Sequence, residues 1–186
     1  VHEKLLETIV EDANIEKAIQ KVVSNKGSGG VDEMQVAEVR THFAQNWSYL
    51  KELIMKGRYS PSAVKRVEIP KENGKKRNLG IPTVTDRVIQ QAIVQVLTPI
   101  FEPTFSDASY GFRPRRNAHQ AVRKVVEYAN NGYRYTIDLD LEKYFDTVNH
   151  SRLIQILSNT IKDGRVISLI HKYLNAGVIV RHKFEE

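Results

Sequence analysis

The sequence predicts an α+β fold in which helices predominate. Apolar residues recur at the spacing of an amphipathic helix along most of the 186-residue chain. In residues 64–81 and 133–141 they alternate with polar residues instead, which predicts a hairpin and a further strand. No repeat, low-complexity tract or long linker interrupts this pattern, so we expect interleaved lobes.

Helical spacing opens the chain. A short helix, a loop and more helix are predicted before a glycine-rich break at residues 26–30. The stretches around residues 36–43 and 47–55 are again helical, and Gly57 ends them.

Further helices follow the hairpin. Thr83 or Thr85 is expected to cap one that Pro99 ends, and Asn117 to cap the next, because such side chains accept hydrogen bonds from the free N–H groups of a first turn. The last third predicts two amphipathic helices and a short strand, around residues 153–161, 166–173 and 178–180.

The hairpin prediction depends on two alternating runs and a turn. Val67 and Ile69 alternate with polar residues on the way out, and Leu79 and Ile81 do so on the return. Between them, Asn73-Gly74 is a strong signal for a tight turn.

The register of the hairpin depends on the length of its loop. A two-residue loop would set Ile69 opposite Asn78, whereas a three-residue loop or a bulge sets Ile69 opposite Leu79. We expect the second, because it keeps the apolar side chains on one face. It also places Lys71 directly opposite Arg77.

The amino-acid composition indicates which kinds of molecule the chain could bind and in which compartment it could occur. The chain has 28 Lys plus Arg against 22 Asp plus Glu, a net charge of +6, which favours a polyanion such as nucleic acid. It has no cysteine, which excludes disulfides and thiolate zinc sites. No apolar run approaches the roughly 20 residues that cross a membrane. We expect a protein of the reducing cytoplasm, without a membrane partner.

The predicted strand at residues 133–141 carries an acidic face. Because side chains alternate along a strand, Asp138 and Asp140 point to one side, roughly 7 Å apart, and Glu142 continues the series. The opposite face is apolar and consists of Tyr135, Ile137, Leu139 and Leu141.

Clustered carboxylates need a neutralising partner. Magnesium ions take oxygen ligands, often one or two carboxylates together with substrate phosphates, so this face is a candidate metal site. The alternative is a solvated strand face, with Asp146 or Asn149 capping the next helix.

Five motifs, in the same order, resemble the group II intron-encoded reverse transcriptases, which are also called maturases. Together they cover most of residues 25–150: Lys26–Asp32, Ile69–Arg77, Leu79–Ala92, Ser109–Pro114 and Asp138–His150.

The resemblance implies helix-rich fingers with a β-hairpin fingertip, and the first part of a right-hand polymerase palm, an antiparallel sheet packed on helices. Residues 1–85 would form the N-terminal extension and fingers, and residues 86–186 the first part of the palm, interleaved with the fingers. The chain starts at Val1 and ends at Glu186, and we expect an excised fragment without the later palm, thumb and C-terminal domains.

The resemblance also implies a catalytic role for Asp140. In the complete enzyme this side chain would hold two Mg²⁺ ions, with the carbonyl of Leu141 as a further ligand. A primer 3′-hydroxyl would then attack the α-phosphate of a dNTP. Asp138 is expected to have only a local electrostatic role.

Three residues would contact the nucleotide. By resemblance, Phe145 lies beneath the sugar and excludes a 2′-hydroxyl, although it and Tyr144 would equally suit a protein core. Lys71 and Arg77 would grip the triphosphate. Like charges directly opposite across two strands are destabilising unless an anion lies between them, which agrees with that role.

The remaining basic residues would contact nucleic acid. Lys26 belongs to a stretch that the family places near template RNA, and the arginines lie beside Tyr110 and Phe112 in a loop suited to phosphates and stacked bases. The alternatives are solvated turn lysines and arginines that pair with acids. The full set is Lys26, Lys75, Lys76, Arg113, Arg115 and Arg116.

The function implied is RNA-directed DNA synthesis on intron RNA, combined with assistance to splicing. Expected partners are group II intron RNA, an RNA/DNA template-primer, dNTP and a second copy of the chain. The family's other two catalytic aspartates lie in a later Ala-Asp-Asp hairpin that this sequence lacks, so we expect the chain alone to be inactive, and its Mg²⁺ site to be weak.

Three alternatives stay open. The chain could act as an RNA-binding scaffold and splicing cofactor. It could belong to another bacterial reverse transcriptase, from a retron, a diversity-generating element or a CRISPR locus. A basic α+β protein that is no polymerase is the third, but it leaves the ordered motifs unexplained.

Overall fold

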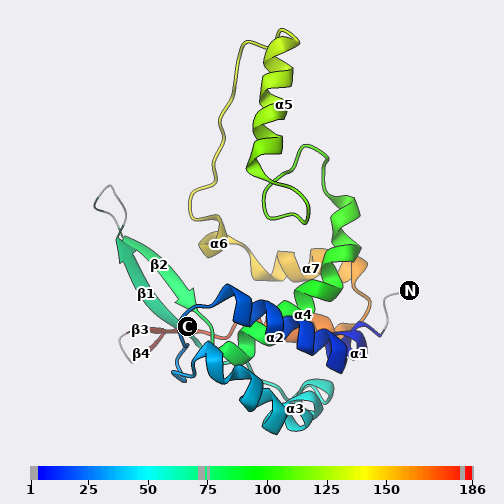
Figure 1. The fold of residues 1–186 in the computed structure, drawn as a ribbon, viewed down its shortest axis with the longest axis vertical. Helices are drawn as coiled ribbons and strands as arrows, with labels where there is room; N and C mark the ends of the chain where they lie inside the picture. Colours follow the sequence, from blue (N-terminus) through cyan, green and yellow to red (C-terminus); the bar gives the residue numbers. More distant parts are fainter. Residues whose placement is uncertain (1–3, 71–73, 75, 181–182, 186) are drawn as a thin grey trace. The chain divides into compact units, whose positions relative to one another are not determined.

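The computed structural model describes residues 4–70, 74, 76–180 and 183–185, and the chain divides into two compact units. Unit 1 comprises residues 1–96 and 149–186, and unit 2 comprises residues 97–148. The long helix α4 (Val84–Phe101) begins in unit 1 and ends in unit 2 (Figure 1).

Unit 1 is built on helices whose apolar faces meet. Besides most of α4 these are α1 (Leu5–Ile9), α2 (Asp12–Asn25), α3 (Val39–Met55), α7 (His150–Thr160) and α8 (Gly164–Leu174). A 3₁₀ turn, Val36–Glu38, leads into α3. Burial of apolar side chains drives this packing, and the core includes Leu6, Ile9, Val88, Ile89, Ala92 and Val166.

The structure confirms most of the predicted helices. The stretches around residues 36–43 and 47–55 join into the single helix α3 and its 3₁₀ turn. Thr83 rather than Thr85 caps α4, because the N–H of Asp86 donates to Thr83 Oγ1 at 3.1 Å. The prediction that Pro99 ends this helix is wrong: proline removes one N–H donor, and the helix continues to Phe101.

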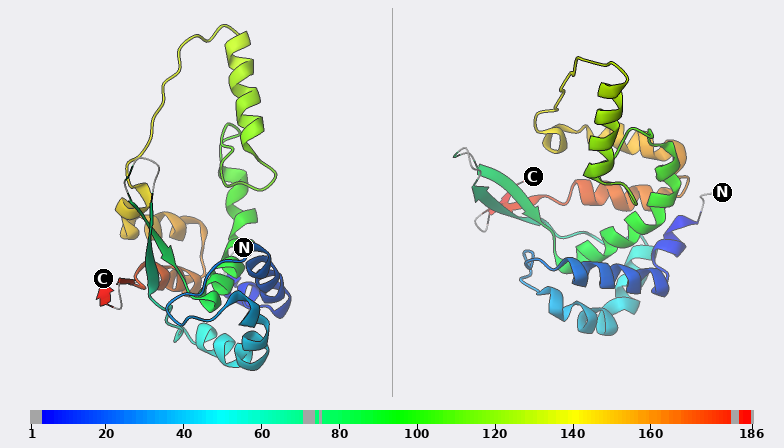
Figure 2. Two further views of the ribbon diagram at one scale, coloured as in Figure 1. Left: turned by 60° about the vertical axis from the view of Figure 1, so that its left-hand side comes forward. Right: turned by 45° about the horizontal axis from the view of Figure 1, so that its top comes forward.

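Unit 1 also holds a four-stranded sheet, in the order β2-β1-β3-β4. Its strands are β1 (Val64–Pro70), β2 (Lys76–Ile81), β3 (Val178–Val180) and β4 (Lys183–Glu185). Strands β1 and β2 form the predicted antiparallel hairpin, which projects from the helices of unit 1 in Figure 1 and in the right-hand view of Figure 2. The β1–β3 pair is parallel, so the sheet is mixed. The α+β class is confirmed.

The predicted register of the hairpin is wrong. Ile69 lies opposite Arg77 rather than Leu79, and among the described residues the pairs run as far as Pro70 with Lys76. Arg77 therefore has Ile69 as its partner across the hairpin, in place of the expected Lys71. A shift of two residues preserves the alternation, so the apolar side chains still share one face. Of the predicted turn pair, Asn73 lies outside the described residues, while Gly74 has a φ of 76°, a conformation that favours glycine.

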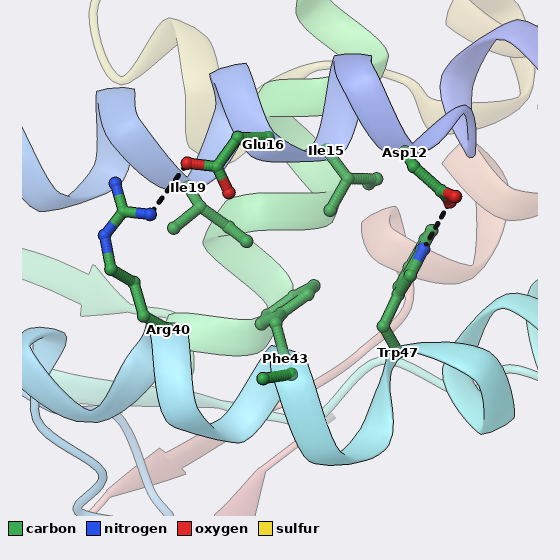
Figure 3. A pocket seen from close by; sticks show the side chains of 8 residues that line it. Asp12, Ile15, Glu16, Ile19, Arg40, Phe43 and Trp47 are labelled. Carbon is green, nitrogen blue, oxygen red and sulfur yellow. Dashed lines mark hydrogen bonds and ion pairs between the residues drawn. The ribbon is translucent and has the colours of Figure 1, made fainter.

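A groove of about 340 Å³ lies between α2 and α3 (Figure 3). Apolar side chains, among them Ile15 and Phe43, line it. A hydrogen bond closes each end: Arg40 Nη1 donates to Glu16 Oε1 at 2.7 Å, and Trp47 Nε1 to Asp12 Oδ1 at 2.9 Å. These two hydrogen bonds hold α2 and α3 together, and the side chains that line the groove do not form a catalytic site.

Unit 2 contains the end of α4, a 3₁₀ turn Glu102–Thr104, α5 (Ala118–Asn130) and α6 (Tyr144–Thr147). Asn117 caps α5 as predicted, accepting from the N–H of Gln120 at 3.1 Å. The predicted strand at residues 133–141 does not form. A strand needs a neighbour for its backbone N–H and C=O groups, and within the described ranges nothing pairs with this segment. Its alternating apolar side chains, such as Ile137, are therefore exposed.

Candidate active site and nucleic-acid interface

Asp140 lies in the extended segment that precedes α6, and its carboxylate is open to solvent. Its Oδ1 atom accepts a hydrogen bond from the N–H of Leu141 at 2.9 Å. Throughout the described part of the chain, no Lys, Arg or His forms an ion pair with it. The carboxylate is therefore available to a cation that the protein does not supply.

The oxygen atoms at this position fit a magnesium ion in part. A carboxylate and a backbone carbonyl are hard donors, and Mg²⁺ commonly uses only one or two carboxylates besides water and phosphate. Asp138 and Glu142 are also exposed and add negative charge nearby in sequence. No group of three His, Cys, Asp or Glu that could hold a metal occurs among the described residues. Asp140 and Leu141 thus offer part of a coordination shell.

Phe145 belongs to α6 and is 86% exposed. Its ring packs edge-on against Tyr144, with 5.4 Å between centroids. Both rings are exposed, so the structure does not support the alternative that Tyr144 and Phe145 belong to the core. The predicted contact of Phe145 with a nucleotide sugar stays a prediction.

Two of the four basic residues predicted around the fingertip are described. Arg77 is exposed on β2, on the same face as Val67 and Leu79. Lys76, on the other face, forms an ion pair with Glu68, so it is a surface charge with a partner. Lys71 and Lys75 lie outside the described residues.

Arg113 is used within the protein, which supports the alternative that this arginine pairs with an acidic residue. Its Nε and Nη2 atoms donate to the carboxylate of Glu102 at 3.1 and 2.9 Å, and its Nη1 donates to the carbonyls of Ser106 and Ser109 at 2.6 and 3.0 Å. The side chain is only 7% exposed. All three nitrogens are engaged in folding the loop after α4, which leaves none to reach a phosphate.

The two neighbouring arginines differ. Arg116 pairs with Asp107 and lies over the ring of Tyr110, 5.4 Å from its centroid. Arg115 is exposed, has a left-handed backbone with a φ of 61°, and has no side-chain partner among residues 4–70, 74 and 76–180. Arg115 thus remains the freest predicted nucleic-acid contact of this loop.

A structural role for Arg87 was missed from sequence. This residue of α4 reaches the glycine-rich loop, where its Nη2 donates to the carbonyl of Ser28 at 2.6 Å and its Nη1 to that of Lys26 at 3.5 Å. Burial lowers the pKa of its guanidinium, against the opposing effect of Asp32. The side chain of Lys26 is exposed, so it stays a candidate contact. Arg87 is the only cation in α4, and this was the available signal.

The glycine-rich loop packs directly on the backbone before α4. A Cβ atom added at Gly30 would lie 2.7 Å from the Cα and N atoms of Thr83. Real Cβ contacts are never that short, and backbone cannot move aside like a side chain. The loop and the α4 motif, far apart in sequence, therefore form one substructure of unit 1.

Replacing Gly30 by alanine is expected to destabilise the chain by about 2 kcal/mol, the cost of overpacking a close contact. Gly164→Ala is the matched control, since a Cβ there meets no atom within 4 Å. Its effect should stay within about 0.5 kcal/mol. Chemical denaturation of both variants measures the difference, and equal midpoints would contradict the close packing at Gly30.

Residues 69–186 match the family model described as reverse transcriptase (RNA-dependent DNA polymerase). The chain belongs to this family. Its relatives include Protein YkfC of Escherichia coli (strain K12), 36% identical over 183 residues, and the group II intron-encoded protein LtrA of Lactococcus lactis subsp. cremoris, 36% identical over 173 residues. These alignments cover 95% and 91% of this chain.

The chain spans about half of YkfC (48%) and 28% of LtrA. Among solved structures, a partial Cas6-RT-Cas1–Cas2 complex shares the fold, with a TM-score of 0.61 over 97% of this chain and 29% of the matched one. Sequence identity there is 23%, so that likeness concerns the fold alone. No helix in the described ranges is long and apolar enough to span a membrane.

Proposed function

We propose that this chain supplies the fingers and the first part of the palm of an RNA-directed DNA polymerase, encoded by a group II intron, that also assists splicing. The observation that carries the proposal is the exposed Asp140, followed by the Leu141 carbonyl, in a chain of the reverse transcriptase family. The relative LtrA is itself named as group II intron-encoded. The 23% identity to the CRISPR-associated structure gives no comparable support to that alternative.

In this proposal, residues 1–85 act as N-terminal extension and fingers, and residues 86–186 as palm interleaved with fingers. This division concerns function, whereas units 1 and 2 follow compactness. The net charge of +6 favours the proposed partners, intron RNA and a template-primer. A cysteine-free chain also suits the reducing bacterial cytoplasm in which we place the protein.

Asp140 and the carbonyl of Leu141 would hold magnesium, together with aspartates from elsewhere in the full-length protein. When bound, such ions stabilise the charge on the attacking and leaving oxygens of a nucleotidyl transfer. The chain's own contribution is an uncompensated carboxylate, held in place by a backbone N–H. Phe145 would limit the space beside the sugar.

Arg77 would bind the triphosphate of the incoming nucleotide, with Lys71 beside it. A guanidinium contacts two phosphate oxygens at once, and Arg77 is exposed on a hairpin that stands clear of the helices of unit 1. Lys26, Lys75, Lys76, Arg115 and Arg116 would add contacts with the nucleic-acid backbone.

Arg77→Gln in the full-length protein is expected to raise KM for dNTP about tenfold, the loss of one charge-assisted phosphate contact. Steady-state kinetics at varied dNTP concentration measure it. Arg58→Gln, which removes an exposed charge outside the hairpin, is the control and should leave KM unchanged. An unchanged KM for Arg77→Gln would remove this residue from the nucleotide site.

The proposed function is tested by primer extension. Full-length protein, a primer annealed to an RNA template, dNTPs and Mg²⁺ should yield DNA, and the same preparation should promote splicing of the intron RNA. Splicing without extension would favour the alternative of an RNA-binding scaffold. If the protein shows neither DNA synthesis nor promotion of splicing, the proposal is contradicted altogether.

A further inference from the structure

Asp86 is a buried carboxylate that the site described above does not use. It lies in the first turn of α4 and is 1% exposed. Three donors reach it: Tyr59 Oη at 2.7 Å, Thr83 Oγ1 at 2.7 Å and the N–H of Ser62 at 3.1 Å. Within the described residues no cation forms an ion pair with it.

A buried charge without a counter-ion is expensive, and capping α4 does not require one. Thr83 already accepts a hydrogen bond from the N–H of Asp86, so α4 has a cap without the carboxylate. The carboxylate oxygens are instead directed to donors in neighbouring segments. This arrangement calls for a role beyond ending the helix.

The donors come from both ends of the hairpin. Ser62 lies just before β1, which begins at Val64, and Thr83 lies just after β2, which ends at Ile81. The Asp86 carboxylate thus ties the two roots of the hairpin to α4. Apart from β2, β1 pairs in the described sheet only with β3, at Val64 and Lys65.

Helix α8 closes this cluster from another direction. Lys172 Nζ donates to the carbonyls of Gly57 and Tyr59, at 2.6 and 2.9 Å. The hydroxyl of Tyr173 is buried, and burial, then the nearby Tyr59 and Asp86, raises its pKa well above 10. Burial and Asp86 likewise raise the pKa of Tyr59. Both phenols therefore stay protonated at neutral pH, and Tyr59 remains a donor to Asp86.

A small rotation at the root becomes a large displacement at the tip. Arg77 lies four residues along β2 from Ile81, or about 13 Å at about 3.3 Å per residue. A swing of about 10° would move Arg77 by about 2 Å, and a misplacement of about 1 Å can cost about 10²-fold in rate.

We propose that Asp86 is a positioning residue, which holds the root of the β1–β2 hairpin so that Arg77 reaches the triphosphate of the incoming nucleotide. It contacts neither nucleotide nor metal and acts through the hairpin. The expected effect of Asp86 on nucleotide binding rests on the proposed function. The anchoring of the hairpin by Asp86 does not depend on that function.

The test uses Asp86→Asn in the full-length protein. Asparagine keeps the shape, but it replaces one acceptor oxygen with an NH₂ group that faces another donor. KM for dNTP should rise about tenfold or more, while kcat changes less than about threefold, because the reacting groups are untouched. Amide hydrogen exchange of residues 64–69 and 76–81 should accelerate.

Two further variants make the result specific. Tyr59→Phe removes one donor and should give a smaller change in the same direction, which keeps the test open if Asp86→Asn folds poorly. Asp12→Asn makes the same chemical change at an exposed carboxylate and should alter neither KM nor hairpin exchange.

A fall in kcat with an unchanged KM, or unchanged exchange of the hairpin amides in Asp86→Asn, would overturn the inference. If the wild-type protein makes no DNA, the proposed function fails. The hydrogen-exchange comparison then still decides whether Asp86 anchors the hairpin.

Discussion

Asp140→Asn in the full-length protein is expected to lower the rate of DNA synthesis at least about 10³-fold. A bound metal supplies several kcal/mol of transition-state stabilisation, and each 1.36 kcal/mol is a factor of about ten. Asparagine removes the charge that holds the metal but keeps the size of the side chain. Its amide oxygen can still accept the hydrogen bond from the N–H of Leu141. The fold should therefore be unaffected.

Asp138→Asn is the matched control, because it makes the same change at an exposed carboxylate two positions earlier. Its effect should be less than about tenfold, as expected of a local electrostatic contribution. Binding of intron RNA and splicing should be equal in wild type and in both variants. DNA synthesis that survives Asp140→Asn would show that Asp140 is not the metal-binding aspartate.

Asp163→Ala is expected to lower the free energy of unfolding by about 2 kcal/mol, since removing this buried carboxylate leaves the N–H of Leu6 without its acceptor and removes one ion pair of the half-exposed Arg165. Asp163 is 3% exposed and joins two helices. Its carboxylate accepts from the N–H of Leu6 in α1 at 3.0 Å, and from Arg165 Nε and Nη2 in α8 at 3.0 and 2.8 Å. Arg165 also binds Glu7 with two hydrogen bonds, at 2.8 and 2.7 Å.

Denaturation of the 186-residue chain, followed by the fluorescence of Trp47, its only tryptophan, measures this loss. Asp107→Ala is the control, because that carboxylate is fully exposed although it pairs with Arg116. Its effect should stay within about 0.5 kcal/mol. Equal losses in the two variants would show that burial of Asp163 contributes nothing.

The contribution of Asp163 should also depend on pH. Burial opposes its charge, but hydrogen bonds from Arg165 and from the N–H of Leu6 outweigh burial and lower its pKa. A carboxylate with a lowered folded-state pKa stabilises the fold above its unfolded value, about 3.9, and loses this contribution as pH falls through the folded value. The stability difference between wild type and Asp163→Ala should be constant above about pH 5 and shrink below about pH 4. A difference that persists at the lowest pH would contradict this origin.

Local chemistry was enough for most of the helices, for the cap of α5 and for the face of the hairpin, and it narrowed the cap of α4 to two threonines. Asn117 and Thr83 cap helices because a short polar side chain before an apolar helical pattern leaves few other arrangements. The alternation of apolar and polar residues correctly placed Val67, Ile69 and Leu79 on one face of the hairpin, although their predicted cross-strand partners were wrong. Both signals act within a few residues, which is why one sequence suffices to recognise them.

Partners distant in the chain could not be derived in this way. Alternation with a period of two residues leaves the register of the hairpin undecided in steps of two residues. Segment 133–141 has the alternation of a strand, but pairing needs a neighbour that alternation does not identify. The engagement of Arg113 by Glu102 and the burial of Asp86 among Tyr59, Ser62 and Thr83 likewise arise only when the chain folds.

The amino-acid order alone thus sufficed for the α+β class, the family and the position of the acidic segment, because these depend on spacing and on contiguous motifs. Which charged side chains face solvent, and which are bound within the protein, was settled by packing. The residues next to a charged side chain in the sequence are the same whether that side chain contacts water or a distant segment of the chain. The free energy of the side chain differs between these two environments, and only the folded chain determines which of them it has.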